Sequence, residues 1–455
     1  MLNAVFERFV TESPISVMSR GLMEGVLAPE ALDRIFEANA QVQYTRELLF
    51  SDLVNLMSLV VCGIYPSVNA AYRARAQQLN VSRTAVYDKL NGVEPRVGAA
   101  LVKETAAAMA SLIEFTGGSS PKLLAPYKVR IIDGNCLAGT DHRLEVLRPI
   151  GAVALPGKSL VILDPELRLA IDVFPCVDGH AQERSLFDKV LATVQPGEVW
   201  IGDRAMCTSG FLRGITSSGS HFVIRRHKSL SLTPVSERQY CGETSTGQLF
   251  EQMVRLNYPG EELLIRQVTI ELFKPTRNGE KEVEVLTRLS TTEATAAVVA
   301  QLYIERRSVE NLFQTVTENY EGEIQTLGYP QAALFSFCLA LVTYNVLATI
   351  RAVIASVHGV GKIEAGLSDY YMVDEIQSTY RGMMIAIPSE NWRIFTQCDR
   401  EALGNILLDL AGRVDLKRFL KNTRATKKKK SPPYCDARHR HVSTSRLLDR
   451  AQQPP

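Results

Sequence analysis

The stretches YKVRIIDGN, residues 127–135, and EVWIGDR, residues 198–204, decide the fold of this chain. Each contains a short apolar run rich in β-branched residues that ends in an aspartate, Asp133 in the first and Asp203 in the second. Runs of this kind, bounded by polar residues, predict strands. A lone aspartate after a strand is more often a turn residue. In open α/β sheets, however, functional side chains gather at strand ends, so both aspartates are candidate site residues.

Neighbouring segments extend this prediction to an α/β domain over about 125–350. The β-rich runs KSLVILD, RLAIDVFP and SHFVIRR flank the two stretches, and a helical segment, HAQERSLFDKVLATV, precedes the second of them. Strands that alternate with helices predict an α/β sheet. Between about 226 and 290, turn signals at Pro259-Gly260 and Asn278-Gly279 accompany β-rich runs, which predicts a β insertion.

A third candidate element, YIERRSVENLF at residues 303–313, follows the insertion within a helix predicted over about 292–320. Tyr303, Arg306 and Glu310 stand at positions i, i+3 and i+7, which places them within a band about 60° wide on a helix. A charged face turned to solvent is the alternative interpretation. Because apolar runs flank the segment on both sides, one of its faces must pack against protein.

Asp133, Asp203 and Glu310 together supply three carboxylates, the ligand type that Mg²⁺ prefers. Two such ions about 4 Å apart activate a water or a 3′-hydroxyl and stabilise the leaving oxygen of an in-line phosphoryl displacement. The Arg306 guanidinium and the Tyr303 phenol are suited to hold the phosphate of a cut strand. The constellation predicts metal-dependent phosphoryl transfer.

His180 and Glu183 stand three positions apart in the helix predicted before Asp203, the spacing of a metal-binding pair. A capping or surface role is the favoured interpretation, because the three carboxylates already account for a metal site.

Residues 71–93, AYRARAQQLNVSRTAVYDKLNGV, have the pattern of a helix-turn-helix. Asn80 stands where a left-handed turn residue is needed, and the next helix begins after Ser82, a capping residue. Polar and basic side chains at the start of a recognition helix reach phosphates and base edges in the major groove. A plain packing pair of helices is the alternative. The predicted DNA contacts are Ser82, Arg83, Thr84, Tyr87 and Lys89.

The bulk composition excludes several classes of protein. The chain has 455 residues, of which 46% are hydrophobic and 22% charged, as in a globular protein of several domains. The N-terminus lacks the pattern of a signal peptide. Polar residues interrupt the longest apolar stretch, 332–354, which favours a buried core helix over a membrane span. The eight cysteines include no C-x-x-C pair, so neither a zinc knuckle nor a disulfide framework is indicated.

Positive charge is concentrated near the C-terminus. Residues 417–446 contain eleven Lys or Arg and one acid, Asp436, which leaves a net charge of −8 on the rest of a chain whose total is +2. Blocks of like charge are usually disordered arms that contact nucleic acid. A tail that only improves solubility is the alternative.

The order of these motifs resembles that of the DDE transposases of bacterial insertion sequences. IIDGN, IGDR, a β insertion and Y-x₂-R-x₃-E follow one another over about 127–350, and LGYPQAALFSFCLALVTYNVLA after them also resembles that family. The branch it resembles belongs to the insertion-sequence-four family and carries a Tyr-Arg-Glu-Lys signature. Thr317 stands where that signature has its lysine.

The resemblance implies an α/β fold with an RNase H-like catalytic core and a β-rich insertion. An all-α N-terminal domain and a helical C-terminal region accompany the core. The expected divisions are a DNA-binding domain at 1–120, the catalytic domain at 125–350, the helical region at 351–420 and a basic, disordered tail at 421–455.

The resemblance also implies cut-and-paste transposition, with cleavage at terminal inverted repeats and strand transfer into target DNA. Asp133, Asp203 and Glu310 match the family's metal-binding triad for two Mg²⁺ or Mn²⁺ ions, and Tyr303 and Arg306 match its phosphate-contacting pair. The expected partners are double-stranded DNA and a second copy of the chain, in the bacterial cytoplasm at the nucleoid, without a membrane. Two alternatives are a domesticated, catalytically silent DNA-binding protein and an RNase H-like nuclease without strand transfer.

Overall fold

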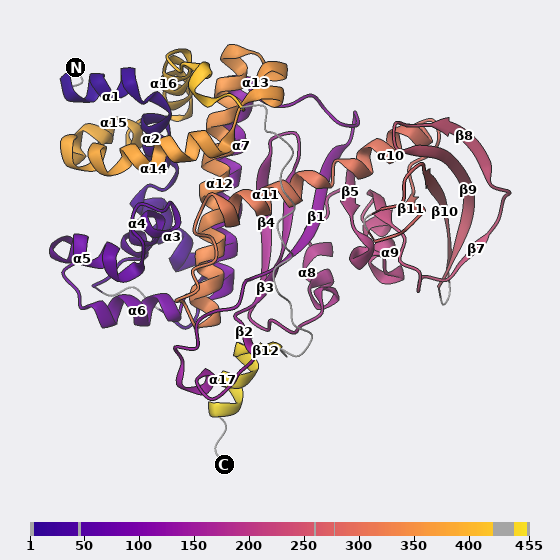
Figure 1. Cartoon of the computed structure of the whole chain (residues 1–455), viewed down its shortest axis with the longest axis horizontal. Coiled ribbons are helices and arrows are strands. Elements are labelled where there is room, and N and C mark those ends of the chain that lie inside the picture. Colours follow the sequence, from indigo (N-terminus) through magenta and orange to yellow (C-terminus); the bar gives the residue numbers. More distant parts are fainter. Residues whose placement is uncertain (1–3, 44–46, 259–260, 277, 422–440, 453–455) are drawn as a thin grey trace.

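A large mixed sheet forms the centre of the molecule, with the N-terminal helices at one end and the inserted strands at the other (Figure 1). Helices α7 (Pro95–Thr116) and α12 (Pro330–His358) pack against each other and against β4 (Leu169–Cys176). The computed structural model describes residues 4–43, 47–258, 261–276, 278–421 and 441–452.

The first five long strands form the predicted core. Their order in the sheet is β4-β3-β1-β5-β6, in which β3 runs antiparallel to β1 and β4, while β5 and β6 run parallel to β1. This mixed topology confirms the predicted RNase H-like fold class. Besides β4, the strands are β1 (Lys128–Cys136), β3 (Lys158–Asp164), β5 (Glu198–Gly202) and β6 (His221–Arg225).

The β insertion extends this same sheet. Strand β11 pairs antiparallel with β6, with Val285 opposite Arg225, and the sheet continues through β10 and β9 to β7, while β8 pairs with β9. The inserted strands are β7 (Leu232–Pro234), β8 (Gln239–Glu243), β9 (Gly247–Tyr258), β10 (Glu261–Leu272) and β11 (Glu282–Thr287).

Alternation along the strands divides the core into two layers. Ile131 of β1 belongs to the hydrophobic cluster beneath α7 and α12, whereas Ile132 belongs to the cluster beneath α8 (Phe187–Leu191) and α9 (Ser209–Ser217). Successive side chains of a strand point to opposite faces, which is why one strand serves both layers. The helix expected over HAQERSLFDKVLATV is shorter than predicted, because a 3₁₀ turn, η2 (Glu183–Leu186), precedes α8.

The N-terminal helices include the predicted helix pair. Helix α5 ends at Leu79, Asn80 is left-handed with φ 51°, and the Ser82 side chain accepts a hydrogen bond from the Ala85 backbone N–H at the start of α6. These helices share one continuous hydrophobic cluster with the sheet, so the boundary expected near 120 stays a prediction. The helices before α7 are α1 (Ala4–Glu12), α2 (Pro14–Val26), α3 (Pro29–Asn39), α4 (Phe50–Val61), α5 (Val68–Leu79) and α6 (Arg83–Asn91).

Helix α12 is long and apolar enough to cross a membrane, yet 94% of its most apolar window is buried inside the structure. The Asn345 side chain donates to the Ala170 carbonyl and accepts from the Ala170 N–H, which ties α12 to β4. The prediction of a buried core helix is confirmed. The helices that follow are α13 (Val360–Gly366), α14 (Asp369–Ala386), α15 (Arg393–Thr396) and α16 (Arg400–Gly412).

The described part of the C-terminal segment has regular secondary structure. Residues 441–452, expected within a disordered tail, form β12 (His441–Ser443), which pairs parallel with β2 (Val153–Leu155), and α17 (Thr444–Gln452). Arg446 forms an ion pair with Asp178, which helps to hold this segment against the core. Most of the predicted basic tail, 422–440 and 453–455, lies outside the described residues.

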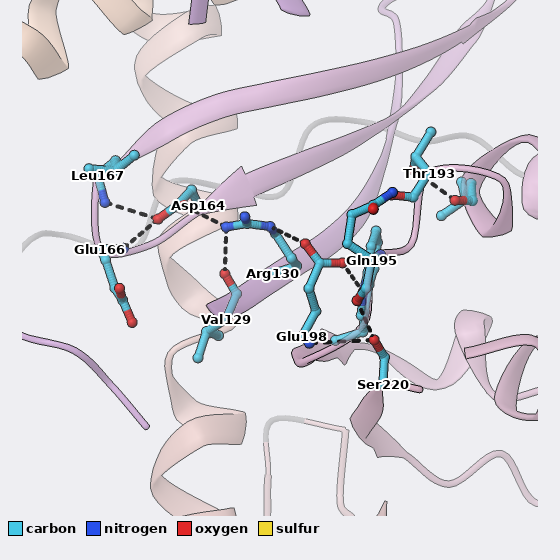
Figure 2. Close-up of polar contacts among 11 residues, drawn as sticks. Val129, Arg130, Asp164, Glu166, Leu167, Thr193, Gln195, Glu198 and Ser220 are labelled. Atoms are coloured by element: carbon cyan, nitrogen blue, oxygen red, sulfur yellow. Dashed lines mark hydrogen bonds and ion pairs between the residues drawn. The ribbon is translucent and has the colours of Figure 1, made fainter. Parts of the chain in front are cut away.

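A buried polar network joins β1, β3 and β5 at the end of the sheet where β1 and β5 begin (Figure 2). The Arg130 guanidinium donates to Asp164 and, over 3.0 Å, to Glu198. Glu198 also accepts from the Gln195 N–H at 2.9 Å and from the Trp200 indole at 3.0 Å. Because each carboxylate oxygen has a partner, the charges are compensated although the three side chains are at most 12% exposed.

Candidate active site at the ends of β1 and β5

The two aspartates lie beside each other across a parallel strand pair. Ile132 of β1 is opposite Gly202 of β5, so Asp133 and Asp203 are the next residues along each strand. Strand β5 ends there because Asp203 is the N-cap residue of a 3₁₀ turn. The prediction that Asp133 also ends its strand is wrong, since β1 continues to Cys136 through its pairing with β3.

The third element is a pair of helices rather than the single helix predicted over 292–320. Helix α10 (Ala296–Ile304) ends, and α11 (Arg307–Glu318) begins after Arg306. At the junction the Arg306 N–H donates to the Tyr303 carbonyl, an i to i−3 bond, and the Ser308 hydroxyl donates to the Glu305 carbonyl. The spacing of Tyr303, Arg306 and Glu310 therefore does not describe one helical stripe, but the junction still turns all three toward the aspartates.

Direct contacts connect these side chains. The Tyr303 hydroxyl donates to Asp203 Oδ1 over 3.3 Å. The Arg306 guanidinium donates to Asp133 Oδ2 over 3.0 Å and to Glu310 Oε1 over 2.6 Å. The structure thus gathers the five predicted site residues from β1, the end of β5 and the α10–α11 junction.

The donor types fit a divalent cation, but their present positions do not form a complete site. Among the residues that the structure describes, no three His, Cys, Asp or Glu side chains converge closely enough to hold a metal. Arg306 accounts for this, because its guanidinium bridges Asp133 and Glu310. Burial opposes the charged form of Arg306, yet the Tyr303 phenol and the neighbouring carboxylates raise its pKa. The cation present at the site is the arginine.

Asp133 is protonated more readily than an ordinary aspartate. Its pKa is raised from 3.8 to about 6, mainly by burial and to a smaller extent by Asp203 and Glu183, while Arg306 and the Gly134 N–H oppose the shift. The Glu183 carboxylate lies so close to Gly134 that a Cβ added there would be 2.3 Å from its Oε1. The sequence predicted a capping or surface role for Glu183 and did not indicate that its carboxylate lies beside Asp133.

Sequence reasoning missed Arg225 as well as this position of Glu183. Burial opposes the charged form of Arg225, but the hydrogen bond with Glu280 and the nearby Tyr303 and Asp203 raise its pKa. Arg225 ends β6, the third parallel strand of the core. The carboxyl ends of parallel strands share one edge of a sheet. The arginines at the end of SHFVIRR could therefore have been predicted to lie beside the aspartates.

Asp133→Asn is expected to stabilise the metal-free protein at pH 7.5 by about 1–3 kcal/mol. The folded-state pKa of Asp133 lies above the unfolded value, so the folded state loses stability as pH rises from about 4 to about 6. Asparagine cannot ionise, so the variant keeps this stability. Thermal midpoints of the variant and the wild type are compared in EDTA at pH 7.5 and at pH 3.5, and the variant's higher midpoint must disappear at pH 3.5. Asp188→Asn, exposed on α8, is the control; an unchanged midpoint for Asp133→Asn at pH 7.5 contradicts the prediction.

The predicted DNA-binding residues of α6 divide into two groups. Ser82, Arg83 and Thr84 are exposed, and Ser82 also caps the helix. Tyr87 packs against the hydrophobic cluster, and the Lys89 ammonium lies 4.6 Å from the centre of the Phe36 ring. Burial lowers the pKa of Lys89. Arg83 and Thr84 are thus the side chains of this set most open to a ligand.

This core, with carboxylates within β1, directly after β5 and on a helix after the insertion, has the RNase H-like fold. Residues 127–346, nearly half of the chain, match the family model described as the transposase DDE domain. The match supports a DNA transposase.

A solved structure of the piggyBac transposase synaptic complex with hairpin DNA aligns with 85% of this chain and 85% of that chain, with 11% identity and a TM-score of 0.40. The curated proteins contain no match.

Proposed function

We propose that this protein is a DNA transposase that cleaves DNA at terminal inverted repeats and joins the released ends to target DNA. We further propose that it belongs to the insertion-sequence-four family of bacterial elements, in the branch with the Tyr-Arg-Glu-Lys signature. The observation that carries the proposal is that Arg306 contacts Asp133 and Glu310 while the neighbouring Tyr303 contacts Asp203, within a segment that matches the transposase DDE domain. Such a protein acts in the bacterial cytoplasm, at the nucleoid.

The proposed triad would hold two Mg²⁺ or Mn²⁺ ions, which activate a water or a 3′-hydroxyl and stabilise the leaving oxygen in phosphoryl transfer. Asp133, with a pKa of about 6, is ionised for this role above that pH. Glu310, with a side chain 52% exposed, is free to turn away from Arg306. The guanidinium released in this way can donate two parallel hydrogen bonds to a phosphate, and the Tyr303 phenol a third. Arg306 therefore exchanges carboxylate partners for the phosphate of the cut strand.

Exposed polar and basic groups would bind the DNA outside the active site. Arg83 and Thr84 lie at the start of α6, where a recognition helix contacts the major groove. The basic segment 422–440 would add contacts to phosphates along the duplex. Binding at two places allows two protomers to bridge two ends of an element, as a homodimer.

Arg83→Ala is expected to weaken binding to the element's end and to reduce the slope of log K against log salt by about 1. One lost phosphate contact releases about one counterion fewer on binding. Fluorescence anisotropy with a labelled duplex at several salt concentrations measures the slope. Arg413→Ala is the matched control, since Arg413 is an exposed residue directly after α16 and is paired with Asp409. Equal slopes for the two variants argue against α6 as a DNA-binding helix.

The proposed function is tested by incubating the wild-type protein with Mg²⁺ and a labelled duplex that carries the end of its own element. Specific cleavage and joined products are expected. Cleavage without joined products supports a nuclease, and binding without cleavage supports a silent DNA-binding protein. Omission of the divalent cation must stop cleavage and leave binding in place.

A further inference from the structure

A cavity of about 630 Å³ opens between α2, α5 and α14, away from the proposed active site. Helix α5 is the first helix of the predicted helix-turn-helix, and it contributes Arg75 and Gln78 to the wall. The remaining walls come mainly from α14 and from Trp392. The cavity therefore adjoins the element proposed to contact DNA.

The lining of this cavity carries positive charge only. Arg20, Arg75 and Arg381 line it, and none of its lining residues is an Asp or Glu. Outside the lining, Glu24 forms an ion pair with Arg20. Arg381 donates to the Ile64 backbone carbonyl, which provides no negative charge. One carboxylate thus faces three guanidiniums.

Arg75 is the least compensated of the three. Its guanidinium contacts the Met384 sulfur at 4.0 Å, and among the described residues it forms no ion pair or hydrogen bond with a carboxylate. Burial lowers the pKa of Arg75 and the nearby Arg20 lowers it further, while Tyr380, Tyr65 and Glu24 only partly oppose the shift. Arg20 also has a buried Nε without a hydrogen-bond partner. Buried charges and donors are costly unless they are paired, so the cavity is built for an anion.

Aromatic side chains beside the guanidiniums add a second requirement. Tyr65, Tyr380 and Trp392 line the cavity, together with Met383 and Met384. A site for a simple inorganic anion needs no such surface. Guanidiniums hold phosphates in a bidentate fork. The aromatic residues contribute an apolar wall rather than free stacking faces, because Arg381 lies 4.6 Å from the centre of the Tyr65 ring and Tyr380 and Trp392 are at most 4% exposed. The combination fits a ligand with a phosphate at one end and a flat apolar group at the other.

We propose that this cavity binds a nucleotide through its phosphate. Its source is either an unpaired end of DNA or a free nucleotide. An origin from DNA rests on the proposed function, because the cavity would then hold a nucleotide displaced from the duplex beside α5. Phosphate recognition by the arginines does not rest on it.

Binding is tested with the full-length protein, without metal, by tryptophan fluorescence and isothermal titration calorimetry. Trp392 reports on the cavity because it lines the wall, whereas Trp200, the other tryptophan, lies in β5 outside the cavity. The ligands are deoxyadenosine monophosphate, deoxyadenosine, and a short single-stranded oligonucleotide with or without a 5′-phosphate. Saturable binding of a phosphate-bearing ligand is expected, with deoxyadenosine at least tenfold weaker, because charge-assisted hydrogen bonds are lost.

Arg75→Gln and Arg381→Gln are each expected to weaken phosphate-dependent binding about tenfold or more. Arg73→Gln, an exposed neighbour on α5 outside the cavity, is the matched control and leaves binding unchanged. Arg381 is exposed, so its variant keeps the test valid if Arg75→Gln does not fold.

Preference for the oligonucleotide supports the proposal and assigns the source to DNA, and preference for the mononucleotide supports it and assigns a free nucleotide. Equal binding by the wild type and both cavity variants, or no saturable binding, overturns it. Because neither metal nor cleavage enters this assay, its failure is distinct from failure of the proposed transposase activity.

Discussion

Asp133→Asn, Asp203→Asn and Glu310→Gln each reduce Mg²⁺-dependent cleavage of the element's end by on the order of a thousandfold or more. Each change replaces one charged oxygen of the proposed metal site with an amide nitrogen, which does not bind the cation. Residues that act as a unit give non-additive losses, so any double variant is expected to be no slower than the slower single variant.

Single-turnover cleavage rates on a labelled duplex measure these losses, and fluorescence anisotropy shows that binding persists. Glu305→Gln is the matched control, because Glu305 lies in the same α10–α11 junction but its carboxylate accepts from Gln301. Near-normal cleavage by any one triad variant removes that residue from the proposed active site. Loss of cleavage in the control as well attributes the effect to the junction rather than to the carboxylates.

Glu198→Ala is expected to lower the free energy of unfolding by about 3–5 kcal/mol, the usual range when one partner of a buried ion pair is removed. The change leaves Arg130 with one of its two carboxylates and removes the acceptor of the Trp200 indole and the Gln195 N–H. The network (Figure 2) lies near the starts of β1 and β5, whereas Asp133 and Asp203 follow further along the chain, so the change leaves the side chains of the proposed metal site in place.

Urea denaturation followed by circular dichroism compares Glu198→Ala with Glu262→Ala, whose side chain is 66% exposed and paired with Arg255. The control is expected to change stability by less than about 0.5 kcal/mol. Glu198→Gln keeps the size of the side chain and is expected to lie between the two. Similar midpoints for Glu198→Ala and Glu262→Ala contradict a structural role for the network.

The contacts between Arg306 and its two carboxylates suggest a reason for the protein to remain inactive until DNA is bound. The guanidinium neutralises part of the negative charge that three nearby carboxylates would otherwise impose on a metal-free site. A phosphate from the substrate offers the arginine an alternative partner. The proposed transposase would therefore complete its metal site as the DNA arrives.

Local patterns were sufficient to predict much of the fold. The runs that became β1, β3, β4, β5 and β6 were recognisable because strand propensity depends on adjacent residues. Asn80 and Ser82 marked the turn between α5 and α6 for the same reason, since left-handed backbone and helix capping are properties of a few consecutive residues. The types of the five site residues were also available from sequence.

Contacts between segments that are distant in the sequence could not be predicted from local patterns. Arg306 and Asp133 are 173 positions apart, and only the packing of α11 on β1 puts a guanidinium between the carboxylates. Continuation of β1 past Asp133 depends on its pairing with β3, and the short helix after β4 brings Glu183 against Gly134.

The sequence by itself determined the strands of the core, the helix pair near the N-terminus and the chemical types at the candidate active site. The tertiary structure alone decided that β11 joins β6, that the helix after the insertion breaks at Arg306, and that three arginines share one cavity. The physical reason is range: backbone propensity acts over a few bonds, whereas burial, ion pairing and strand register are set by residues far away in the chain.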